Sequence, residues 1–213
     1  RYLCGLRQRC GAAIRTGMCK KRQSAFHKDA LGSKGGIKRQ WRRRKMLETE
    51  RLTIRRITPA DYKEAFAWSG DARVNKYLLH NVLEKPEDMI PWLEGLDQSS
   101  GDSYITILHE KTDGHAVGTV GFFRDPETDI WSFAYNIRFD DWGRGYATEA
   151  ARAIMDFVRE KHGAHIFEAE CAAENIASAK VMQHLGLTFD RKSTYAKHDG
   201  SVEFPSEIYR LEE

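Results

Sequence analysis

The chain has 213 residues, of which 41% are hydrophobic and 31% are charged, and its formal net charge is +3 at pH 7. This length fits one ordinary domain rather than two large ones. No run approaches the roughly 18 consecutive apolar residues that a membrane span needs, so a membrane protein is not expected.

The positive charge is concentrated in residues 1–45. This segment holds 15 of the 34 Lys and Arg residues and a single acid, so residues 46–213 carry a formal net charge of −11. Its Gly, Arg and Lys content and weak apolar periodicity predict a disordered leader. Three interpretations stay open: a nucleic-acid-binding arm, an organelle transit peptide, and upstream or non-native sequence. Met46 precedes the first strand pattern, so we expect the folded domain to span 46–213.

The four cysteines divide in the same way. Cys4, Cys10 and Cys19 lie in the leader, and only Cys171 lies in the domain. A single cysteine forms no internal disulfide, which is typical of a reducing compartment and predicts a cytoplasmic protein. The leader cysteines lack the C-x-x-C spacing of zinc sites, so no metal is expected.

The first half of the domain predicts one strand followed by short helices. The expected elements are a strand at 52–57, a helix opening at Thr58, a short helix at 72–79 and a helix at 86–96. Thr58 is a favourable N-cap, Pro59 suits the first helical position, and Asp61 is an acid in the first turn. Pro91 lacks an amide donor and should kink the helix that contains it.

The second half predicts a sheet with one long helix. The expected elements are strands at 104–108, 116–123 and 131–139, a helix ending at Gly163, a strand at 166–171, a helix at 175–185, and a hairpin of 187–195 with 202–211. Short turns between the first three strands indicate an antiparallel meander. The strand, long helix and strand that follow form a crossover, which makes those two strands parallel. The expected fold class is α+β with a mixed, mostly antiparallel sheet.

A glycine-containing segment lies between the 131–139 strand and the long helix. Residues 143–148, here called the glycine loop, read Gly-Arg-Gly-Tyr-Ala-Thr. Glycines let the backbone approach a ligand, and a helix N-terminus favours negative charge, so the loop suits a phosphate or pyrophosphate. A connecting turn without a ligand is the alternative. Neither G-x-G-x-x-G after a first strand nor G-K-[ST] is present, which disfavours dinucleotide and ATP folds.

Two motifs in order carry a family resemblance. The segment W-G-R-G-Y-A-T-E-A, followed by N-I-A-S and H-L-G-L, resembles the GNAT acetyltransferase superfamily. The M-L-E-T-E-R-L start and Thr58-Pro59-x-Asp61 resemble its RimJ/RimL group, which acetylates the N-termini of ribosomal proteins. The resemblance covers about residues 46–213. It implies the GNAT fold, with a central splayed parallel strand pair, and acetyl-CoA as co-substrate.

The resemblance also implies the coenzyme-binding residues. The glycine loop would hold the pyrophosphate through its backbone amides, and Asn175 would bond the pantetheine arm. The implied set is Ile137, Arg138, Phe139, Gly143, Arg144, Gly145, Tyr146, Ala147, Thr148, Asn175 and Ser178. Asp140 stands where the family usually has Gln or Arg, so a side-chain contribution at that position is in doubt.

The catalytic residues are less well defined. Many family members carry a Tyr seven residues after the Asn as general acid, but Met182 stands here, and a thioether has no proton to donate. Ser178 or water would then protonate the departing thiolate, unless Ser178 only caps its helix. Glu168 is the first candidate for the base, Glu170 lies on the same strand face, and three histidines are alternatives: His165, His184 and His198.

The expected activity is acetyl transfer to a primary amine by direct attack. An α-amine with a pKa of about 8 is roughly a tenth neutral at pH 7, whereas a lysine is neutral in about one molecule per few thousand. A protein or peptide N-terminus is therefore the first candidate for the acceptor. A small amine such as an antibiotic, polyamine or amino acid, and a non-catalytic acyl-CoA-binding module, are the alternatives. Nucleic acid is a partner only through the leader, and a homodimer stays open.

Overall fold

The computed structural model describes residues 47–213, so every expectation about the leader lies outside the described residues. Its strands form one eight-stranded sheet in the order β1-β2-β3-β4-β5-β6-β8-β7. The strands are β1 (Leu47–Glu48), β2 (Leu52–Arg56), β3 (Ser103–Glu110), β4 (Ala116–Arg124), β5 (Trp131–Ile137), β6 (Ile166–Ala172), β7 (Thr188–Ala196) and β8 (Glu203–Glu212). Neighbouring strands are antiparallel except β5 and β6, which are parallel. The expected mixed, mostly antiparallel α+β architecture is confirmed.

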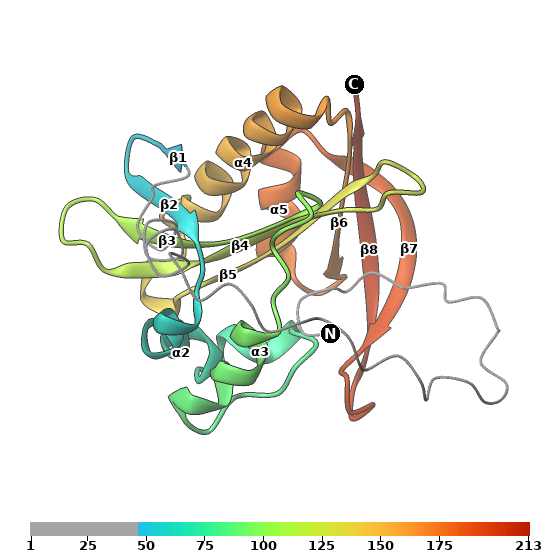
Figure 1. Ribbon diagram of the computed structural model, residues 1–213. Coiled ribbons are helices and arrows are strands. Elements are labelled where there is room, and N and C mark those ends of the chain that lie inside the picture. Colours follow the sequence, from blue (N-terminus) through green and yellow to red (C-terminus); the bar gives the residue numbers. More distant parts are fainter. Residues whose placement is uncertain (1–46) are drawn as a thin grey trace, which may run out of the picture.

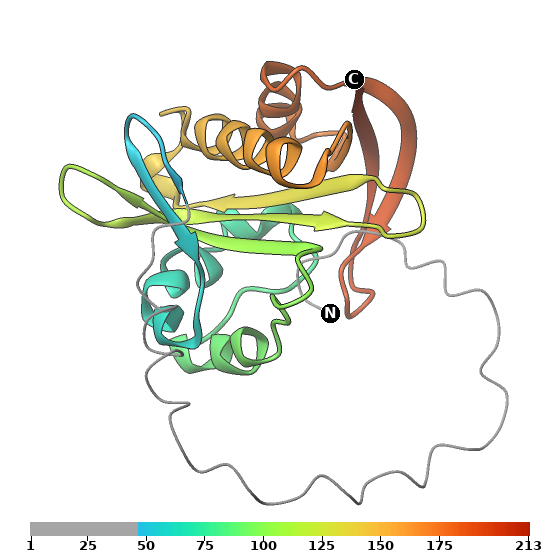
Figure 2. The ribbon, with the colours of Figure 1, turned by 45° about the horizontal axis from the view of Figure 1, so that its top comes forward.

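Helices cover both faces of the sheet. Helices α4 (Tyr146–His162) and α5 (Ile176–His184) lie on one face, and α2 (Tyr62–Ser69) and α3 (Ile90–Glu94) lie on the other (Figures 1 and 2). Two apolar clusters result. The larger contains the buried side of α4, and the smaller lies beneath α2 and α3. No helix within residues 47–213 is long and apolar enough to cross a membrane.

Three expected elements are shorter or divided. The 72–79 helix is a single 3-10 turn at Val74–Tyr77, and the 86–96 helix is a 3-10 turn at Pro86–Met89 followed by α3. Pro91 has no N–H to donate to the preceding turn, so one regular helix cannot run through it. The 131–139 strand ends at Ile137, and Phe139 begins a 3-10 turn, Phe139–Asp141. The expectation that Phe139 lies in the strand was wrong.

The parallel pair is joined over only part of its length. Its register pairs are Trp131 with Phe167 and Ser132 with Glu168, and the later residues of β5 and β6 do not pair with each other. We call this unpaired stretch, residues 133–137 and 169–172, the splay. The expected central splayed pair is therefore present, and the splay exposes one edge of β5 between two otherwise continuous halves of the sheet.

Helix α4 begins and ends at glycines in the left-handed region. Gly145 is its N-cap with φ 80°, and Gly163 is its C-cap with φ 69°. The N–H of Gly163 donates to the carbonyl of Arg159, which satisfies one carbonyl of the last turn. This helix places the glycine loop at the end of β5, next to the splay.

Candidate active site

The glycine loop has a backbone that only glycine adopts without strain at two positions. Gly143 and Gly145 have φ values of 74° and 80°. A Cβ at Gly143 would meet no atom within 4 Å, so its glycine is required by backbone conformation and not by lack of space. These two residues, whose backbones are in the left-handed region, redirect the chain from the 3-10 turn at Phe139–Asp141 into α4.

The backbone N–H groups of the glycine loop are free. Within residues 47–213, none of the six N–H groups of residues 143–148 donates a hydrogen bond, and the first helical bond of α4 runs from Glu149 N–H to Gly145 O. Unpaired donors at a helix N-terminus, together with the positive end of the helix dipole, form a site for an anion. The loop therefore presents the unpaired donors that an anion such as a pyrophosphate requires.

The β1–β2 turn holds the glycine loop from outside. The guanidinium of Arg51 donates to the carbonyl of Arg144 at 2.8 Å and to the carboxylate of Glu149 at 2.7 Å. Glu149 also accepts from the Thr49 hydroxyl at 2.5 Å and from the Arg51 N–H at 3.0 Å. Burial alone would raise the pKa of Glu149, but these hydrogen bonds lower it, so its carboxylate stays ionised.

Arg51 was not a predicted site residue, and its role gives a direct test. We expect Arg51→Met to raise the KM for acetyl-CoA on the order of ten- to a hundredfold and to change kcat little, because the glycine loop, which is predicted to bind the coenzyme, loses its external support. Steady-state kinetics measure this. The matched control is Arg55→Met, which removes another arginine of the same hairpin that pairs with Asp61. Equal effects of both substitutions would contradict the assignment.

The opposite side of the loop is held by Asp141. This carboxylate is 3% exposed, accepts from the Arg144 guanidinium at 2.9 Å and lies 3.0 Å from Nε2 of His115. The carboxylates of Asp113 and Asp141 together raise the pKa of His115, against the opposing effect of burial. The β3–β4 turn is thereby connected to the glycine loop, and the Arg144 side chain is held near the loop's free N–H groups.

At the end of β5, two backbone groups of the predicted pantetheine contact have partners within the protein. The carbonyl of Ile137 accepts from the Trp142 indole at 2.8 Å, and Arg138 N–H donates to Val117 in β4. Because backbone groups alternate along a strand, the N–H and C=O of Tyr135 then point away from β4 and into the splay. Asp140 is exposed and pairs with Arg138 at 3.1 Å.

Asn175 and Ser178 lie together at the start of α5. The Oδ1 of Asn175 accepts from the N–H of Ser178 at 3.2 Å, as an N-cap does. No hydrogen bond among residues 47–213 uses the Nδ2 of Asn175, so its amide donor is free for a ligand carbonyl. The Ser178 hydroxyl accepts from the hydroxyl of Tyr135 at 2.9 Å. Met182 is 2% exposed and belongs to the core.

The two candidate glutamates have different surroundings. Glu168 is bound by two arginines, Arg210 at 2.8 Å and Arg191 at 3.2 Å, and lies where β5 and β6 still pair. Glu170 lies two residues further, in the splay, and accepts from the Ser206 hydroxyl at 2.5 Å. None of the ion pairs found among residues 47–213 includes Glu170. The three histidines of the sequence prediction, His165, His184 and His198, are exposed.

Comparison with known families decides the identity. The model of the acetyltransferase (GNAT) domain matches residues 51–188, which is more than half of the chain and contains both motifs. The chain belongs to the GNAT acetyltransferase family. This GNAT acetyltransferase is 28% identical over 147 residues to an uncharacterized N-acetyltransferase, p20, of Bacillus licheniformis, covering 66% of the chain and 81% of that protein.

Solved structures share the fold of this GNAT acetyltransferase. An acetyl transferase of Salmonella typhimurium that modifies the N-terminal serine of ribosomal protein L7/L12 superposes with a TM-score of 0.67, at 15% identity, over 78% of the chain and 96% of that structure. The microcin C7 self immunity acetyltransferase MccE, solved with acetyl-CoA and AMP, gives 0.66 at 16% identity, over 78% and 94%.

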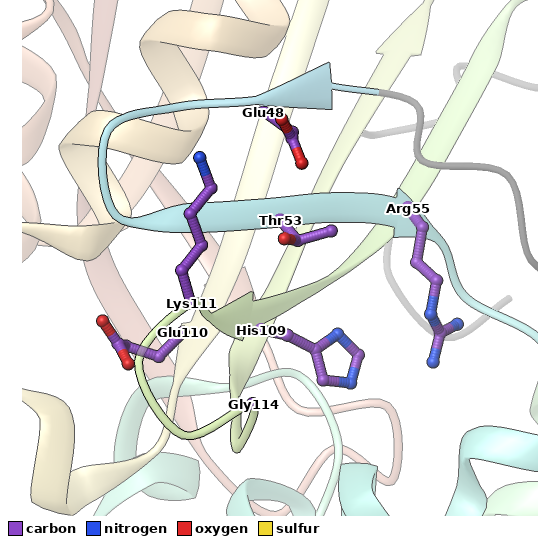
Figure 3. A pocket seen from close by; sticks show the side chains of 7 residues that line it. All are labelled: Glu48, Thr53, Arg55, His109, Glu110, Lys111 and Gly114. Carbon is purple, nitrogen blue, oxygen red and sulfur yellow. The ribbon is translucent and has the colours of Figure 1, made fainter.

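A second surface feature of this GNAT acetyltransferase lies away from the splay. A shallow depression at the β1 end of the sheet is lined by Glu48, Thr53, Arg55, His109, Glu110, Lys111 and Gly114 (Figure 3). Its neighbouring cluster of Glu110, Asp113 and His115 brings three potential ligand atoms within 4.8 Å. Glu110 accepts from Thr112, however, and His115 contacts Asp113 and Asp141, so these groups already stabilise the turn.

Proposed function

We propose that this enzyme transfers an acetyl group from acetyl-CoA to a primary amine, and that the amine is the N-terminal α-amine of a protein or peptide. The observation that carries the proposal is the row of six free N–H groups in the glycine loop, directly beside the splay of β5 and β6. The co-substrate supplies a thioester, whose acyl carbon an amine can attack.

Each part of the site has a role in this proposal. The glycine loop binds the pyrophosphate, with the Arg144 side chain beside it. Ile137, at the end of β5, Arg138 and Phe139, which follow it, and the Nδ2 of Asn175 contact the pantetheine arm. Ser178, at the first turn of α5, donates its proton to the departing sulfur. Its position next to the exposed edge of β5 supports this role.

Direct attack by the amine is favoured over an acyl-cysteine intermediate. Burial, together with the nearby carboxylates of Glu207 and Glu170, raises the pKa of the Cys171 thiol to about 11. Only about one thiol in ten thousand is then ionised at pH 7, and the thiolate is the nucleophile. Cys171 lies near Ser178 but is a weak nucleophile, so the acceptor and the co-substrate bind together.

The acceptor amine has to lose a proton before attack, and an α-amine requires less help than a lysine. Glu168 was our first candidate for the base. Two arginines already pair with its carboxylate, whereas Glu170 lies in the splay and accepts from the Ser206 hydroxyl, so we propose Glu170 for this role. The domain's formal net charge of −11 attracts cationic acceptors, which fits an amine substrate.

One structural neighbour modifies the N-terminal serine of a ribosomal protein, which supports an N-terminal acceptor. The small-amine alternative is tested beside it.

The test is titration of the full chain with acetyl-CoA, followed by thiol release against peptides with free N-termini, the same peptides with blocked N-termini and internal lysines, and small amines. We expect saturable binding and fastest release with free N-termini. Binding without release would favour the non-catalytic module, and faster release with small amines would transfer the proposal to them. With the best acceptor, Glu170→Gln should lower kcat at pH 7 more than Glu168→Gln does.

A further inference from the structure

Tyr135 occupies a position that the sequence did not single out. It lies on β5 within the splay, and its hydroxyl donates to the Oγ of Ser178 on α5. The two residues are 43 positions apart, so the contact exists only in the folded chain. A second polar group, the thiol of Cys171 on β6, also lies near the Ser178 hydroxyl. Three elements thus meet at the serine proposed as proton donor.

The direction of this hydrogen bond follows from acidity. A phenol is a stronger acid than an aliphatic alcohol and is the better donor, so the favoured arrangement has Tyr135 donating and Ser178 accepting. Burial raises the pKa of Tyr135 to about 12, so its hydroxyl remains protonated over the neutral range. The serine's own proton is then left for another acceptor.

We propose that Tyr135 is a positioning residue whose hydrogen bond to Ser178 orients the serine hydroxyl, so that its proton points into the splay toward the sulfur of coenzyme A. This inference rests on the proposed function. Tyr135 transfers no proton in it. By occupying a lone pair of the serine oxygen, it fixes the hydroxyl's direction and makes the serine proton more acidic, and Ser178 then stabilises negative charge on the sulfur.

The first test measures the protons released when coenzyme A binds, and it does not depend on turnover. A donor aimed at the sulfur lowers the pKa of the bound coenzyme A thiol, so near pH 8 binding of coenzyme A should release protons. Calorimetric titrations in two buffers of different ionisation enthalpy measure the number released. We expect release with the wild type, little release with Tyr135→Phe or Ser178→Ala, and none with desulfo-coenzyme A. Wild-type release in Tyr135→Phe would overturn the inference.

The second test is a double-mutant cycle on kcat. Tyr135→Phe keeps the ring and removes only the hydroxyl, and we expect it to lower kcat roughly tenfold with the KM for acetyl-CoA little changed. In the Ser178→Ala background, the same substitution should have no further effect, because the groups act as a unit. Additive effects would show a role independent of Ser178 and would overturn the inference.

These outcomes separate the inference from the proposed function. If the wild type binds no coenzyme A, the proposed function fails. If it binds and turns over, and Ser178→Ala is impaired while Tyr135→Phe is not, only the positioning role fails. Thermal unfolding of each variant provides the structural control, since a loss of kcat with an unchanged Tm is a local effect.

Discussion

Replacing Gly143 and Gly145 together with valine will weaken acetyl-CoA binding by roughly a hundredfold or more while the protein remains folded. Both residues have positive φ values, where a β-branched side chain is strained by about 1–2 kcal/mol each. The loop relieves that strain by moving its N–H groups. Hydrogen bonds to a charged group contribute about 1.5–3 kcal/mol each, so losing two of them weakens binding by roughly a hundredfold or more. Titration calorimetry measures this.

The chain contains a matched control for strain alone. Gly200 has φ 73° in the β7–β8 turn, and a Cβ there would also meet no atom within 4 Å. Gly200→Val should therefore lower the free energy of unfolding by an amount comparable to one loop substitution, yet keep the affinity for acetyl-CoA. A folded Gly143→Val/Gly145→Val variant that binds normally would refute the assignment of the loop.

The loop was predictable from the sequence because its chemistry is local. Two glycines, the residues between them and the first turn of a helix are adjacent in the chain, so backbone freedom and helix polarity act within six residues. The Asn175 cap is also local, since the Oδ1 of Asn175 bonds an N–H three residues away. Such features need no knowledge of tertiary structure.

The partners of the loop and of Ser178 were not predictable in this way. Arg51 meets Glu149 across 98 residues, and Tyr135 meets Ser178 across 43. Strand alternation could have placed Tyr135 on the same face as the buried Phe133, but not beside α5. The two arginines beside Glu168 were not predictable from the sequence either, because Arg191 and Arg210 approach from the closing hairpin.

Fold boundaries were missed where tertiary contacts compete with local preference. The apolar run to Phe139 predicts a longer strand, but Trp142 donates to the carbonyl of Ile137 and its ring packs on Phe139 at 5.0 Å. The strand therefore ends at Ile137, two residues before its predicted end. That early turn brings Asp141 beneath the glycine loop, where it accepts from Arg144.

Ser178→Ala will lower kcat about a hundredfold and leave the KM for acetyl-CoA within about twofold of the wild type. A positioned general acid contributes roughly 10²–10⁴, and water can replace part of it, which sets the expected loss at the lower end. The N-cap bond to the N–H of residue 178 comes from Asn175 and survives the substitution, so α5 should remain formed. Steady-state kinetics with the best acceptor measure both constants.

The control removes a hydroxyl from the same region of the sheet. Ser132 lies on β5 where it still pairs with β6, and its hydroxyl donates to the Phe123 carbonyl at 3.3 Å. Ser132→Ala should leave kcat unchanged, and Ser178→Thr, which keeps a hydroxyl, should recover part of the loss. If Ser178→Ala turns over as fast as the wild type, water protonates the sulfur. Ser178 then has no catalytic role and is only a residue of the first turn of α5. Tyr135→Phe would then also have no effect on kcat, so one pair of variants decides both assignments.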